Sequence, residues 1–255
     1  MSPRLARWMA TIPGLSDPPL KVGYARSELR ASPAEELALA FDELCQGVDS
    51  ANETEREAAR DALRAFIPVL VDPEYLEPIQ AVRQAARGAS LVATSRLLRC
   101  SSHQGHQSAM PELVHKDQRT LSLGERRALA RKPSRAMLAK LLHDPHPMVA
   151  QLLLANPRIT ELDVITMVAR RPAIPKIAVE VAKAWSRRPR VRMALALNPT
   201  APPAVCVPLL VLMTRAELAE VAQAADLLPV VRATAHELWE LRPPLRPAAV
   251  PELAH

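Results

Sequence analysis

Apolar residues recur every three or four positions along most of this chain, which is the period of one buried helix face. The first clear example opens with Ser32-Pro33-Ala34-Glu35, a sequence typical of a helix start, and continues through Leu37, Phe41 and Leu44. Similar patterns begin near residues 53, 72 and 90, so residues 31–99 are predicted to form an acidic N-terminal helical lobe. Residues 1–30 are rich in proline and are predicted to be an irregular lead-in.

The second half of the chain has a different texture. Residues 100–118 are polar and show no periodicity, which predicts a linker. Over residues 119–241, short apolar-periodic segments alternate with prolines, and several open with capping-box patterns, as at Thr160–Asp163. Residues 242–255 are predicted to be a Pro-rich tail. The chain is therefore predicted to be all-α, with two helical parts joined by a linker.

One segment of the second half is echoed 42 residues later. Residues 147–157 read PMVAQLLLANP and residues 189–199 read PRVRMALALNP. A period near 40 residues with two or more helices per unit is typical of HEAT and armadillo solenoids, in which stacking completes the core of each unit. The echo predicts a right-handed α-solenoid of HEAT-like helical repeats over residues 119–241, capped by the N-terminal lobe.

The repeated pattern V-x-x-x-L-x-x-N-P, at 149–157 and 191–199, resembles the HEAT-like α-helical repeat superfamily. Within it, the bacterial leucine-rich-repeat-variant type is the most similar. The resemblance covers residues 121–240 and implies a helical binding scaffold. The variant-repeat type can carry an iron–sulfur module bound by clustered cysteines. Because Cys45, Cys100 and Cys206 are isolated, we expect no cofactor here.

Composition agrees with helices and argues against membrane insertion. Hydrophobic residues make up 49% of the chain but aromatic residues only 3%, and there are 25 prolines against 6 glycines. Sheet proteins need more β-branched and aromatic runs than this. The longest apolar run, 205–213, is about half of what a bilayer requires. With three widely spaced cysteines and no secretory signal pattern, we expect a cytoplasmic protein.

The net charge of +6 conceals two regions of opposite sign. Residues 28–80 hold 13 acidic and 4 basic residues, whereas residues 119–192 hold 16 basic and 5 acidic residues. Repeats would place equivalent helix ends along one edge, which predicts a basic ridge. We assign to this ridge Arg170, Arg171, Lys183, Arg187, Arg188, Arg190 and Arg192. Helix-dipole capping accounts for some of these cations, because they are expected at helix C-termini.

The sequence offers few candidates for catalysis or metal binding. Cys100, His103, His106 and His115 lack the paired spacing of zinc sites, so we predict no metal site. The chain contains no P-loop, nucleophile-elbow or H-E-x-x-H pattern, and no catalytic residue is assigned. Asn156 and Asn198, each followed by proline, are interpreted as structural turn residues.

Two functions follow from these observations. The first is a non-enzymatic helical-repeat scaffold that binds a protein partner, and pairing of its acidic and basic regions, within one chain or between two copies, belongs to this interpretation. The alternative is a HEAT-like module that binds nucleic acid or another polyanion through the basic ridge. A DNA-repair enzyme on the same repeats fits less well, because it would need aromatic residues and a catalytic acid in one groove.

Overall fold

The computed structural model describes residues 1–101, 103, 121–132 and 134–243. The described residues form α-helices and one 3-10 helix, without any strand, so the prediction of an all-α chain is confirmed. The first six helices are α1 (Pro3–Thr11), α2 (Pro18–Ala31), α3 (Ala34–Val48), α4 (Glu53–Leu70), α5 (Leu76–Gly88) and α6 (Val92–Leu97), with η1 (Pro73–Tyr75) before α5. The others are α7 (Leu123–Arg131), α8 (Arg135–Leu141), α9 (Pro147–Leu154), α10 (Glu161–Ala169), α11 (Pro175–Trp185), α12 (Pro189–Ala196), α13 (Pro203–Leu210), α14 (Arg215–Gln223) and α15 (Pro229–Leu241).

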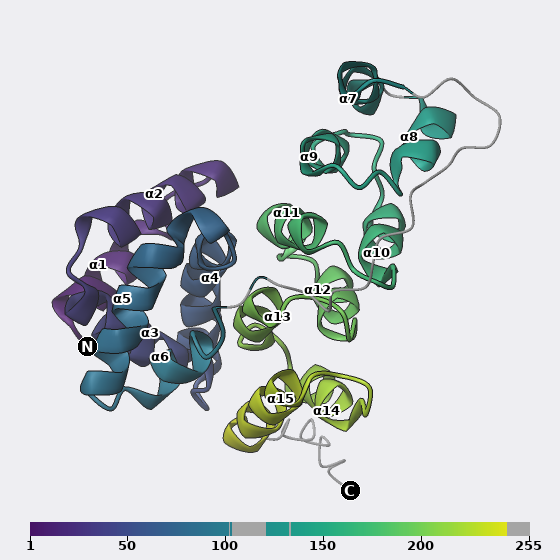
Figure 1. Cartoon of the computed structure of the whole chain (residues 1–255). Coiled ribbons are helices and arrows are strands. Elements are labelled where there is room, and N and C mark those ends of the chain that lie inside the picture. Colours follow the sequence, from purple (N-terminus) through teal and green to yellow (C-terminus); the bar gives the residue numbers. More distant parts are fainter. Residues whose placement is uncertain (102, 104–120, 133, 244–255) are drawn as a thin grey trace, which may run out of the picture.

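The N-terminal lobe comprises α1 to α6, and it begins earlier than the sequence suggested (Figure 1). The prediction of an irregular lead-in over residues 1–30 is wrong, because Pro3 and the Pro18–Pro19 pair start helices instead of breaking them. Trp8 of α1 is fully buried, and its ring lies 5.1 Å from that of Phe41 and 4.3 Å from that of Phe66. The first helix therefore supplies the centre of this lobe's core.

The second half forms two rows of helices (Figure 1). One row contains α7, α9, α11, α13 and α15, in which each helix packs on the next, and the other contains α8, α10, α12 and α14. Helices of the first row begin at intervals of 24 to 28 residues. The 42-residue echo therefore does not separate equivalent helices of one row. It spans three helices and relates α9 of one row to α12 of the other.

What the echo repeats is a buried asparagine that joins neighbouring helices of a row. The Asn156 amide donates to the carbonyls of Ala130 (2.8 Å) and Lys132 (3.1 Å), at the end of α7. The Asn198 amide donates in the same way to Val168 (2.7 Å) and Arg170 (2.9 Å), at the end of α10. The prediction of a structural role is confirmed, but the role is to satisfy carbonyls of another helix that would otherwise lack donors.

The two halves share one continuous core, and polar contacts reinforce the junction. Helix α4 packs on α11 and α13. Lys183 pairs with Asp72 at 2.7 Å, which is one ion pair of the kind predicted between the basic and acidic regions. Elsewhere the signs are reversed, since Arg96 and Arg99 of the lobe bind Glu237 of α15 at 3.1 and 2.6 Å. Hydrogen bonds from Arg99 hold the pKa of Glu237 below its ordinary value.

Candidate functional site

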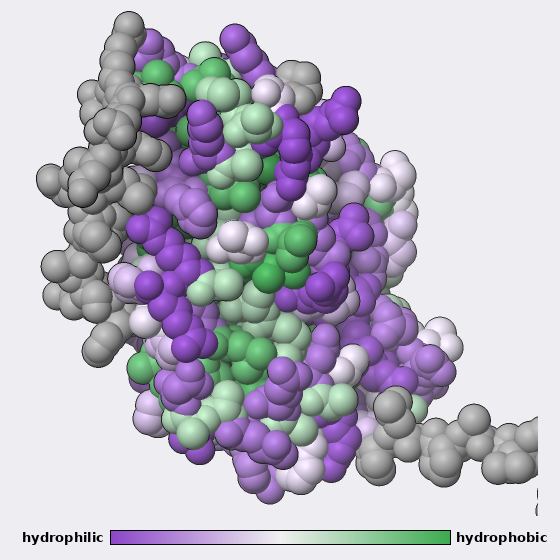
Figure 2. Space-filling model, turned by 90° about the vertical axis from the view of Figure 1, so that its right-hand side faces the viewer, coloured by the Kyte–Doolittle hydropathy of each residue, from purple (hydrophilic) through white to green (hydrophobic). Residues whose placement is uncertain are grey.

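The outer face, which we define as the exposed side of α8, α10, α12 and α14, carries the most prominent apolar surface of the second half. Figure 2 shows apolar side chains gathered in an upright band over this face, with polar side chains on both sides. We call this the apolar band. Its members are Leu162, Ile165 and Ala169 of α10, Met193 and Ala194 of α12 with Leu197 at its C-terminus, and alanines 136, 139, 216 and 219 of α8 and α14.

Helix α10 shows why the band exists. Its inward side buries Val164, Met167 and Val168, and its outward side presents Leu162, which is 65% exposed. The half-buried Ile165 lies one turn further along the same outward side. A helix of an ordinary surface would be polar there, whereas α10 is apolar on both sides. That all-round pattern was the signal in the sequence for a second contact surface, and it was missed because attention fell on the charges.

A carboxylate fixes how α10 meets α8 beneath the band. Asp163 completes the capping box with Thr160 and also accepts hydrogen bonds from Arg135 of α8, at 2.5 and 2.7 Å. The hydrogen bonds from Arg135 are the largest contribution to lowering the pKa of Asp163 to about 2, and those from Thr160 add to it. This acid is therefore charged and already neutralised by a partner at physiological pH, and its side chain is almost fully buried.

The predicted basic ridge is divided between two edges of the outer face. The first edge carries Arg187 and Arg188 in the turn between α11 and α12, and Arg190 in the first turn of α12. All three are exposed, and none forms an ion pair with any residue that the structure describes. Arg188 occupies the N-cap position of α12 without a side-chain capping bond. These arginines stand at the positive end of the α12 dipole, so dipole capping does not explain them.

The opposite edge carries Arg170 and Arg171, where the C-termini of α8, α10 and α12 meet. Arg170 donates to the carbonyl of His143, after α8, at 3.1 Å. Arg171 donates to the carbonyl of Leu197, after α12, at 3.4 Å and pairs with Asp226 at 3.3 Å. These two arginines fit the expectation of cations at helix C-termini, where they satisfy free carbonyls.

Two residues assigned to the ridge do not belong to it. Arg192 is only 5% exposed, and its guanidinium donates to the carbonyls of Ser186 (3.0 Å) and Arg187 (3.3 Å). It follows the buried Val191 and precedes the buried Leu195 by three positions, which places it on the inward side. Lys183 is held between Asp72 and Glu180 on the side that faces the N-terminal lobe. Neither side chain is available to an external anion.

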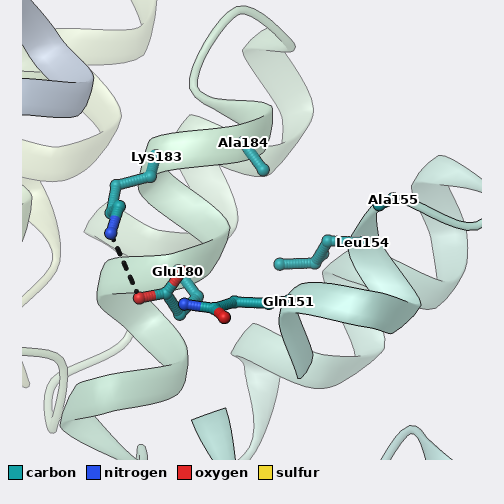
Figure 3. Close-up of a pocket in the computed structure, with 6 residues that line it drawn as sticks. All are labelled: Gln151, Leu154, Ala155, Glu180, Lys183 and Ala184. Atoms are coloured by element: carbon teal, nitrogen blue, oxygen red, sulfur yellow. Dashed lines mark hydrogen bonds and ion pairs between the residues drawn. The ribbon is translucent and has the colours of Figure 1, made fainter. Parts of the chain in front are cut away.

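A shallow pocket of about 250 Å³ lies between α9 and α11. Figure 3 shows its lining, in which Leu154 and the amide of Gln151 face Glu180 and Lys183, and a dashed line joins the last two. The Lys183 ammonium is also bound to Asp72, and the pocket presents no nucleophile. The pocket is thus a gap between paired side chains and offers no arrangement for acid–base or covalent chemistry.

The metal-like residues are only partly placed. His106 and His115 lie outside the described residues, and the His103 Nε2 atom is 3.1 Å from the carbonyl oxygen of Val71. Burial raises the pKa of the half-buried Cys100 thiol. In the described ranges, no three His, Cys, Asp or Glu side chains come together in a way that could hold a metal ion.

No helix within the described part of the chain is long and apolar enough to cross a membrane. Comparison with known proteins adds no further assignment: no protein-family description, curated protein or solved structure matches this chain. Function must therefore be argued from the outer face itself.

Proposed function

We propose that this chain is a non-enzymatic, HEAT-like helical-repeat scaffold that binds a protein partner through the outer face of a right-handed solenoid. The single observation that carries the proposal is the apolar band, centred on Leu162, whose side chain is 65% exposed. Contiguous exposed apolar surface bordered by polar residues marks interaction sites in proteins of known function. The N-terminal lobe packs against the other row of helices and leaves this face open.

Site-specific cross-linking in living cells tests this proposal. A photo-reactive amino acid is placed at Leu162 and, as a matched control, at Leu20 of α2, which is 57% exposed but lies on the N-terminal lobe. Position 162 should give discrete cross-links to another protein that position 20 does not give. Absence of cross-links at position 162, or the same products at both positions, would overturn the proposal.

The alternative function is binding of nucleic acid or another polyanion, and the observation in its favour is the unpaired arginine group at the start of α12. Arg187, Arg188 and Arg190 are exposed and close in sequence, as phosphate-contacting residues commonly are. If they bind duplex DNA, their joint replacement by Glu should abolish retention of the DNA at low salt. Failure of the wild-type chain to retain DNA at low salt, together with a 260/280 nm ratio of pure protein, would reject this alternative.

A further inference from the structure

We infer that the outer face binds an acidic amphipathic helix of a partner protein, laid across α8, α10, α12 and α14 with its apolar side on the apolar band. The inference rests on the proposed function and adds the chemistry of the partner. Three properties of the face lead to it: the length of the band, the depth of its side chains, and the charge of its two edges.

The length of the band matches a helix of ordinary size. Packed helices lie about 8–10 Å apart, so a row of four spans about 27 Å between its outer axes. An α-helix rises about 1.5 Å per residue, and about 18 residues cover the same distance. The band runs across the helices of the row in Figure 2. A single helix of the partner can therefore follow it from α8 to α14.

The band is shallow and suits a helix better than a bilayer. Leu162 projects, whereas Ile165, Met193 and Leu197 are half buried and the remaining members are alanines. Alanines permit the close approach of another helix, and methionine adapts to irregular partners. Insertion into a membrane requires several large side chains that reach about 5–10 Å below the headgroups, and this face has one.

The charge of the borders selects an acidic partner. Arg187, Arg188 and Arg190 line one edge, and Arg170 and Arg171 line the other. The acids nearest to the band are already engaged, since Asp163 binds Arg135 and Asp226 binds Arg171. A helix with Glu or Asp on both sides of an apolar stripe would meet arginines on both edges, which favours association and fixes its placement. Duplex DNA would leave the apolar band facing phosphates, so the observations favour a protein.

A peptide-binding measurement tests this inference with the full chain. The probe is a fluorescent peptide of about 18 residues, with Leu at helical i, i+3, i+4 and i+7 spacing and Glu at the flanking positions. A second peptide has Lys in place of Glu, and a third is scrambled. Fluorescence anisotropy at low and high salt should show binding of the Glu peptide at least about tenfold tighter than of either control, weakening as salt rises.

Variants of the chain localise the binding. Leu162→Glu should weaken the Glu peptide by about tenfold or more, because a buried leucine contact is lost and a like charge is added. The triple change Arg187→Glu, Arg188→Glu and Arg190→Glu should weaken it similarly and flatten its salt dependence. The matched controls are Leu20→Glu and the triple change Arg7→Glu, Arg26→Glu and Arg87→Glu on exposed positions of the N-terminal lobe, and both should stay within about twofold of wild type.

Several results would overturn the inference. Equal binding of the Glu, Lys and scrambled peptides would remove the acidic helix, as would equal losses in Leu162→Glu and Leu20→Glu. Tight binding of duplex DNA or of phosphatidylserine vesicles that is insensitive to Leu162→Glu would assign the edges to phosphate instead. If Leu162→Glu loses its helical circular-dichroism signal, Leu162→Ser replaces it. Cross-links at position 162 without peptide binding would refute the acidic helix and leave the proposed function standing, whereas absence of both would refute both.

Discussion

Replacement of Asn198 by alanine removes the contact that joins the end of α12 to the end of α10. The amide of Asn198 donates to two carbonyls, those of Val168 at 2.7 Å and Arg170 at 2.9 Å. Its Oδ1 atom accepts from the amide and hydroxyl of Thr200, at 3.0 and 2.8 Å. The side chain is buried, so water cannot replace these partners without entering the fold.

The expected loss of stability follows from these bonds. A buried hydrogen bond contributes about 1 kcal/mol net, and a buried carbonyl left without a donor costs about 1–3 kcal/mol. Two orphaned carbonyls, partly relieved by local relaxation, predict a loss of about 3 kcal/mol in the free energy of unfolding. This is a large share of the roughly 5–15 kcal/mol that a folded chain holds in total.

Urea denaturation followed by circular dichroism at 222 nm measures this loss. The control is Asn52→Ala, which removes the exposed N-cap of α4 and should cost about 1 kcal/mol. Asn156→Ala should resemble Asn198→Ala, because Asn156 makes the equivalent bonds at the end of α7. If Asn198→Ala costs no more than Asn52→Ala, the buried amide does not hold the two helices together and the reasoning is wrong.

Three further predictions concern the lobe, the junction and the α8–α10 contact. Trp8→Ala should destabilise the chain by about 3–5 kcal/mol in the same urea assay, because the fully buried ring contacts Phe41 and Phe66; a small change would mean that α1 is not part of the core. Arg242→Met should cost about 3–5 kcal/mol by leaving the carboxylate of Asp49 unpaired, and addition of Asp49→Leu should recover part of that loss; strictly additive effects would contradict the pairing. Because the folded pKa of Asp163, about 2, lies below the ordinary value of about 4, its stabilising contribution is complete above pH about 4 and is lost as pH falls towards 2. The stability difference between wild type and Asp163→Asn should therefore shrink over that range, and a difference independent of pH would count against the Arg135 pair.

Local sequence signals predicted individual helices well. The Thr160–Asp163 capping box starts α10, Ser122 starts α7 with a capping box, and Thr214 does the same for α14. Such signals succeed because caps act within one turn of the backbone. The same signals were misinterpreted at Pro3 and Pro18, where proline starts a helix and was taken as a sign of irregular chain.

Long-range geometry decided the candidate site. The sequence placed seven cations on one ridge, but helix direction in the two rows sends Arg187, Arg188 and Arg190 to one edge and Arg170 and Arg171 to the other. The inward side of α12 buries Arg192 next to Val191, and the junction with the N-terminal lobe occupies Lys183. Which charges stay free depends on neighbours distant in sequence, and those are known only once the helices are packed.

The sequence by itself determined that this chain is helical, where most of its helices begin, and that an asparagine recurs with a fixed neighbourhood. Periodicity and capping are properties of a few adjacent residues, so they can be recognised without the fold. Only the tertiary structure decided what the 42-residue echo joins, because Asn156 and Asn198 bind carbonyls more than twenty residues away. It also decided that Leu162 faces outward: α10 is apolar on both sides, and packing against α11 and α12 buries only one of them.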